Sequence, residues 1–121
     1  MLTIPQGGPD QAFLNFFRKH GYKTIPGSSL LDPSVPMAFV MSAGLVQVES
    51  SARLYDDQIG PKYALIQNCF RYFDMSLVGN SDNHLSLFRM LGAFTFEAID
   101  RRDIILKIGT LLTGVYHIPL E

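Results

Sequence analysis

The fold of this chain is decided by two stretches of sequence, YALIQNCFRY at residues 63–72 and LSLFRMLGAFTF at residues 85–96. Both are rich in the apolar and aromatic residues that favour β-strands. Between them, residues 74–83 contain the run GNSDN, which is a dense turn signal. Two strands joined by such an excursion are most simply antiparallel, so we predict a long hairpin in which the two strands pair as neighbours.

Upstream of the hairpin, the sequence predicts a helix over residues Asp10–His20. Its first residue is a suitable N-cap, its phenylalanines cluster at helical spacing, and Gly21 supplies a left-handed residue to end it. A short strand is expected at Tyr22–Ile25 and an apolar central strand at Met37–Met41. Residues 45–58 fit neither the helical nor the strand pattern clearly.

Downstream of the hairpin, apolar residues recur near the helical period over about Asp100–Thr113, which predicts an amphipathic C-terminal helix. The expected fold class is therefore α+β (mixed α/β), an antiparallel sheet flanked by helices. A chain of 121 residues and 13.5 kDa has room for one domain, so we expect residues 1–121 to form a single unit.

The composition excludes several classes of protein. The chain is 47% hydrophobic and 17% charged, which is too apolar for disorder, yet no apolar run reaches the ~18–20 residues of a membrane span. The N-terminus lacks a signal-peptide pattern, so we expect a cytoplasmic protein. A single cysteine, Cys69, excludes a disulfide scaffold and is expected to be a small core residue.

The charge pattern limits the kinds of partner. The net charge is −1 and no basic block is present, so a nucleic acid would bind only weakly to this chain alone. The apolar surplus on so small a domain instead suggests a surface that a protein partner covers. The three histidines and Cys69 are not at metal-ligand spacing, so no metal site is predicted.

The chemically informative residues flank the turn of the hairpin. Arg71 and His84 lie at the mouths of the two strands, and an arginine on a rigid strand is suited to grip a phosphate with two hydrogen bonds. Phe88 lies on the same strand face as His84 and would offer a flat ring to a nucleotide base. The alternative is structural: Arg71 pairs with Asp74 or Asp82, His84 caps a turn, and Phe88 is core.

The same residues carry a family resemblance. Phe70-Arg71, a loop and His84-x-x-x-Phe88 resemble motif 2 of the class II aminoacyl-tRNA synthetases, and residues 88–96, FRMLGAFTF, are similar to the run FEMLGNFSF of the alanyl-tRNA synthetase family. The upstream sequence is similar to that family's opening, FLxFFxxxGHxxVPSSSLVxxxDPTLLFTNAG, which contains motif 1. The resemblance runs from about Ala12 to Glu121.

This resemblance implies a sheet that binds ATP, with Mg as its companion ion, and alanine. By position, Arg71 would be the catalytic residue that holds the α-phosphate of ATP, His84 would face the γ-phosphate, and Phe88 would stack on adenine. The first helix and motif 1 would lie near a dimer contact, which implies a homodimer or another synthetase-type protein partner.

The departures from the family pattern are as informative as the matches. Where the family has a glycine pair and a lysine after its motif 2 arginine, Arg71 is followed by residues 72–74, YFD, in a shorter loop. Arg89 replaces a glutamate, Leu85 a histidine and Ser42 an asparagine. We also expect the chain to be truncated before motif 3, the alanine-gripping residues and the tRNA-recognition and editing domains.

Two functional interpretations follow. In the first, the chain is a truncated or degenerate paralogue that lacks alanine–tRNA ligase activity alone and acts as an interaction or regulatory module. In the second, it is the ATP-binding front half of an alanine–tRNA ligase active site, completed by another chain or by missing sequence. The substitutions at the loop, Arg89 and Ser42 favour the first. An unrelated α/β domain is the third, bland alternative.

Overall fold

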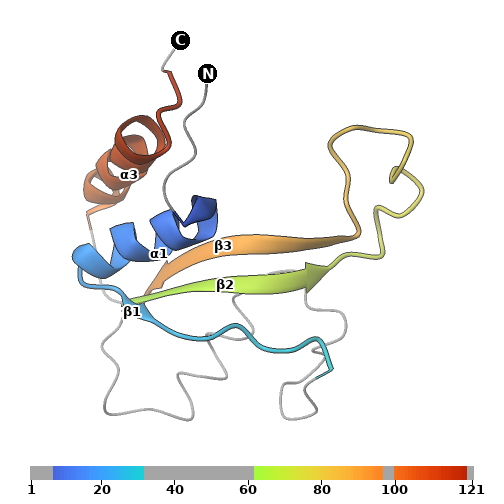
Figure 1. Cartoon of the computed structure of the whole chain (residues 1–121), viewed down its shortest axis with the longest axis horizontal. Coiled ribbons are helices and arrows are strands. Elements are labelled where there is room, and N and C mark those ends of the chain that lie inside the picture. The colour runs from blue at the N-terminus through green and yellow to red at the C-terminus, as the bar shows by residue number, and fades with distance from the viewer. Residues whose placement is uncertain (1–6, 32–61, 97–99, 120–121) are drawn as a thin grey trace.

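The computed structural model describes residues 7–31, 62–96 and 100–119, which build one three-stranded sheet with helices above it (Figure 1). The elements, in chain order, are α1 (Gly8–Lys19), β1 (Lys23–Thr24), β2 (Lys62–Phe70), β3 (Leu87–Thr95), α3 (Arg101–Thr110) and a π-helical turn η2 (Leu111–Val115). This is the mixed α/β arrangement that the sequence predicts. The predicted strand at Met37–Met41 and the ambiguous residues 45–58 lie outside the described residues.

The hairpin is confirmed. β2 and β3 are antiparallel neighbours whose register runs from Lys62 opposite Thr95 to Phe70 opposite Leu87. β1 lies on the other side of β2 and is parallel to it, with Lys23 opposite Tyr63. The described sheet is therefore mixed, and the expectation of a wholly antiparallel sheet is corrected at β1. Parallel neighbours need a long connection, and residues 25–61 supply one.

The start of α1 differs from the prediction. The N-cap is Gly7, in the left-handed conformation with φ of 87°, and Asp10 lies inside the first turn. Pro9 explains the shift, because its fixed φ suits the first helical positions and it has no N–H that would need a cap. Asp10 still favours the positive end of the helix dipole. At the other end, Gly21 has φ of 82°, as expected of a left-handed terminator.

The main core lies between α1 and the sheet. Four residues of α1 are buried, and its phenylalanine rings pack against Tyr22 and against Ala64 on β2. Leu111 from η2 closes the same cluster. A smaller cluster of Ile25, Tyr63 and Leu65, with Phe94 packed against it, lies on the opposite face of the sheet. Strand alternation therefore divides β2 between two apolar clusters.

The C-terminal helix is present as predicted and contributes little to the core. The side chain of Asp100 caps α3 by accepting a hydrogen bond from the Arg102 N–H at 2.9 Å. No residue of α3 itself is buried, and Leu111 at the start of η2 makes the core contact instead. Ile105 and Ile108 of α3 are exposed in this structure. Within the described residues, no helix has the length and apolar character needed to cross a membrane.

Candidate functional site

The mouth of the hairpin contains a cavity of 360 Å³. Arg71, His84 and Phe88 all line it, so the structure brings together the three residues that the sequence singled out. Its other lining residues are Asp74, Asn83, Leu85 and Arg89. The cavity therefore combines cationic side chains, one histidine and an aromatic ring with a carboxylate that the sequence reasoning considered only as a possible partner of Arg71.

Strand register places the Arg71 guanidinium and the Phe88 ring on one face of the sheet. Phe88 lies opposite Cys69 in the ladder, and the Arg71 N–H donates to the Ser86 carbonyl at 2.8 Å, which continues the ladder beyond β2. Because side chains alternate along a strand, Arg71 points to the same face as Cys69 and Phe88. The Arg71 guanidinium carbon then lies 5.0 Å from the centre of the Phe88 ring, a cation–π contact.

His84 is held by the turn. One ring nitrogen, Nδ1, lies 3.0 Å from the Ser81 hydroxyl, which can donate or accept according to the tautomer. This side-chain contact ties His84 to the turn, as the structural alternative expects, and His84 also lines the cavity. Phe88 is half-buried and belongs to neither core cluster.

Cys69 lies directly behind the cavity and is inaccessible. Burial raises the pKa of its thiol, and the positive charge of Arg71 opposes that rise. Its Sγ lies 3.5 Å from the Gln67 carbonyl oxygen. The thiol is therefore neutral at neutral pH and is a core residue, as the sequence predicts. In the described part of the chain, no three His, Cys, Asp or Glu side chains are grouped so that they could hold a metal ion.

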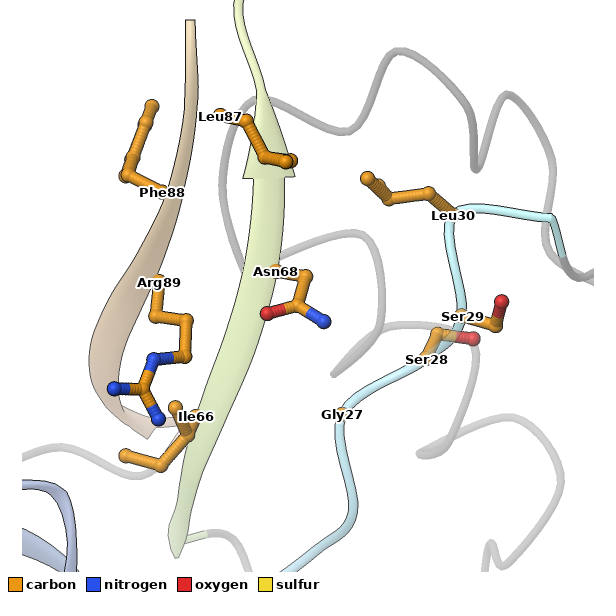
Figure 2. A pocket seen from close by; sticks show the side chains of 9 residues that line it. All are labelled: Gly27, Ser28, Ser29, Leu30, Ile66, Asn68, Leu87, Phe88 and Arg89. Atoms are coloured by element: carbon orange, nitrogen blue, oxygen red, sulfur yellow. The ribbon is translucent and has the colours of Figure 1, made fainter. Parts of the chain in front are cut away.

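A larger hollow of 740 Å³ lies beside the loop that follows β1 (Figure 2). Residues 27–30 form one wall, while Asn68 on β2 and Leu87 and Arg89 on β3 contribute side chains. Arg89 forms an ion pair with Asp10 in the first turn of α1, so it fastens the helix to the sheet. The residue that departs from the family's glutamate thus has a structural role here.

Gln67 is the residue that sequence reasoning missed. Its side chain is fully buried and binds the backbone of Ser28 as another strand would: Oε1 accepts from the Ser28 N–H at 2.9 Å, and Nε2 donates to the Ser28 carbonyl at 3.0 Å. Gly27, the residue before Ser28, lies so close to β2 that a Cβ on Gly27 would be 2.3 Å from the Ile66 carbonyl oxygen. A polar residue between Leu65 and Cys69 on a buried face was the available signal.

Comparison with known proteins connects this hairpin to one family. The family described as tRNA synthetases class II (A) matches residues 10–121, which is nearly the whole chain. The chain belongs to this family. Its described elements are thus a fragment of a class II synthetase domain, and β2 and β3 form the hairpin whose sequence resembles motif 2.

Individual relatives are alanine–tRNA ligases. The chain is 33% identical over 115 residues to the enzyme of Legionella pneumophila (strain Corby), which covers 92% of this chain and 13% of that protein. It is 30% identical over 125 residues to the one from Roseiflexus sp. (strain RS-1), covering 100% of this chain and 14% of that protein. The Thermotoga petrophila ligase is 33% identical over 114 residues, with 92% and 13% covered. The chain spans about an eighth of the length of these relatives.

Proposed function

We propose that this chain is an alanyl-tRNA synthetase-like module that does not form alanyl-adenylate by itself and acts through contacts with protein. The observation that carries the proposal is the contact between Arg71 and Phe88, 5.0 Å from guanidinium carbon to ring centre. In the family's reaction these two residues would hold different parts of ATP, namely the α-phosphate and the adenine. Here they bind each other, which covers one face of the ring.

The electrostatics of the cavity support the same conclusion. Asp74 lines the cavity with Arg71, so a polyphosphate would meet a carboxylate beside the cation that should bind it. The sequence carries no lysine or arginine between Arg71 and Arg89, and Arg89 is paired with Asp10. As placed, the residues do not fit ATP with Mg unless Arg71 leaves the ring. Losing one preorganised donor typically costs a factor of ~10²–10³ in rate, so several losses leave little catalysis.

The test is ATP–pyrophosphate exchange with alanine present, together with calorimetric titration of the chain with ATP and Mg. We expect no exchange above background and weak ATP binding or none. If ATP binds measurably, Arg71→Ala should abolish it, because this guanidinium is the phosphate ligand that the strand presents. The buried substitution Cys69→Ala is the matched control and should leave binding unchanged. Exchange by the purified chain would overturn the proposal.

A second candidate function rests on a specific observation. Arg71, His84 and Phe88 do line one cavity, which is what the ATP-binding front half of an alanine–tRNA ligase site requires. In this alternative, ATP and Mg bind once another chain or missing sequence supplies the remaining ligands. The distinguishing result is exchange activity that appears only when a second polypeptide is added and that is lost with Arg71→Ala. Cytoplasmic location and weak intrinsic affinity for tRNA belong to both proposals.

A further inference from the structure

The loop between β2 and β3 presents a set of apolar side chains to solvent. We call residues 72–87 the hairpin tip. Its large apolar side chains are 37–62% exposed, and they are Tyr72, Phe73, Met75, Leu77, Val78, Leu85 and Leu87. The tip is nevertheless internally bonded, for example through Leu77 N–H to Asp74 oxygen at 3.0 Å and Ser81 N–H to Leu77 oxygen at 3.0 Å. A loop ordered by its own turns holds these side chains outward in a fixed arrangement.

A second apolar surface lies on α3. Ile105 and Ile108 lie three residues apart on one face of α3 and are 68% and 45% exposed, and Leu112 in the adjoining turn η2 is 37% exposed. Leu106 beside them is 62% exposed. We call these four residues the α3 stripe. Because α3 buries no residue of its own, this stripe is the helix's main apolar surface.

The two surfaces carry opposite charges. The tip contains Asp74 and Asp82 and neither lysine nor arginine. The α3 stripe begins next to Arg101 and Arg102, which are both exposed and outnumber the single exposed carboxylate of the N-cap, Asp100, while Lys107 is paired with Asp103. An apolar patch with acidic neighbours thus matches an apolar patch with basic neighbours, which is the complementarity that steers association between proteins.

These surfaces cannot meet within one molecule, because the tip and α3 lie at opposite ends of the described fold (Figure 1). Two copies aligned side by side in opposite directions bring each tip to the other copy's α3, so both contacts form about one two-fold axis. One tip against one helix is too small for a stable interface, which uses ~20–30 residues on each side. Making the contact twice, with residues 72–87 and 101–115 of each copy, reaches that size.

We propose that this chain forms a two-fold dimer in which the hairpin tip of each copy docks on the α3 stripe of the other. The proposal specifies the protein partner of the module proposed above as a second copy of the same chain. It leaves the helix α1 out of the interface, since the phenylalanines of α1 are buried in the core. The dimer would also enclose the tip that borders the Arg71 cavity, which couples association to that site.

The test reverses the charges on each surface by substitution and then measures self-association by sedimentation equilibrium. Protein concentrations of about 1–100 μM bracket the μM dissociation constants expected of a modest interface. Asp74→Lys with Asp82→Lys gives a basic tip, and Arg101→Glu with Arg102→Glu gives an acidic helix start, which suits the helix dipole and so should preserve α3. We expect the unchanged chain to dimerise, and each charge variant alone to dimerise at least tenfold more weakly. An equimolar mixture of the two variants should recover a heterodimer.

Lys23→Glu, an exposed charge change on β1 outside both surfaces, is the matched control and should dimerise like the unchanged chain. Circular dichroism melting of every variant separates lost association from lost folding. A monomer at 100 μM, a dimer insensitive to both charge variants, failure of the mixture to recover, or open-ended growth with concentration would each overturn the proposal. None of these results depends on pyrophosphate exchange, so the dimer and the absence of ligase activity fail separately.

Discussion

Replacing Gln67 by leucine tests how the loop after β1 is held to the sheet. The carboxamide accepts from the Ser28 N–H at 2.9 Å and donates to the Ser28 carbonyl at 3.0 Å and to the Asn68 carbonyl at 2.7 Å. Leucine has similar volume and keeps the apolar contacts of the stem, so the substitution removes the hydrogen bonds with little change in packing. It leaves the backbone N–H and carbonyl of Ser28, a buried residue, without these partners.

The magnitude follows from those two backbone groups. A buried donor or acceptor that loses its partner costs about 1–3 kcal/mol. Two such groups give an expected loss of about 2–4 kcal/mol. A domain of this size is stable by only about 5–15 kcal/mol, so the melting temperature should fall by roughly 10 °C.

Urea unfolding followed by circular dichroism measures this loss. Asn68→Ala is the matched control: its side chain is exposed on the neighbouring position of β2, and only its backbone carbonyl takes part in the Gln67 contacts. The control should stay within about 0.5 kcal/mol of the unchanged chain. A Gln67→Leu variant that unfolds at the same urea concentration as the control would show that the Ser28 pairing contributes nothing to stability.

Three further results are expected. Gly27→Ala should lower the free energy of unfolding by about 1–3 kcal/mol in the same assay, since its Cβ would lie 2.3 Å from the Ile66 oxygen. Gly109→Ala in α3, where a Cβ would meet no atom within 4 Å, should raise it by about 0.5–1 kcal/mol. Equal effects of the two substitutions would contradict the close approach at Gly27. Because burial raises the pKa of the Cys69 thiol, its contribution to stability is complete below the unfolded value of 9.0 and declines as pH rises through the folded pKa. In the Cys69→Ala variant, the free energy of unfolding should therefore fall less steeply as the pH rises above 9.0. Tyr116→Phe removes a hydrogen bond of 2.8 Å to the Pro9 oxygen and should cost about 0.5–1.5 kcal/mol; a neutral result would mean that this link does not hold the C-terminal segment to α1.

The hairpin and the convergence of Arg71, His84 and Phe88 could be predicted because they depend on local rules. Alternation fixes the face of each side chain, and a turn-rich excursion between two apolar runs fixes their pairing. The N-cap of α1 was predicted wrongly because two rules competed: aspartate favours the cap, but Pro9 and the left-handed Gly7 start the helix earlier. Local propensity alone does not rank these two signals.

The pairing of Gln67 with Ser28 and the exposure of α3 could not be predicted, because both depend on which distant segments of the chain meet in space. Nothing near Gln67 in the sequence shows that Ser28 will lie beside it, 39 residues away. The exposure of α3 has the same cause: its apolar spacing is correct for a core helix, but η2 supplies Leu111 to the core in its place. A periodic pattern shows that a helix has an apolar face, and only the tertiary packing decides what covers it.

The register of the hairpin directs its two arginines, Arg71 and Arg89, to opposite faces of the sheet. Asn68 lies opposite Arg89 and Cys69 opposite Phe88, so Arg89 points to the face of α1, where it pairs with Asp10, while Phe88 and Arg71 point to the other face. A slip of one residue would turn Arg89 to the opposite face of the sheet and break its ion pair with Asp10. On the Arg71 face, Leu65, Gln67 and Cys69 are fully buried and Arg71 is the first residue to reach solvent. The Arg71 guanidinium therefore lies at the end of a buried strand, where the core gives way to solvent. The position of β2 thus determines whether this guanidinium contacts the Phe88 ring, a phosphate or a protein partner.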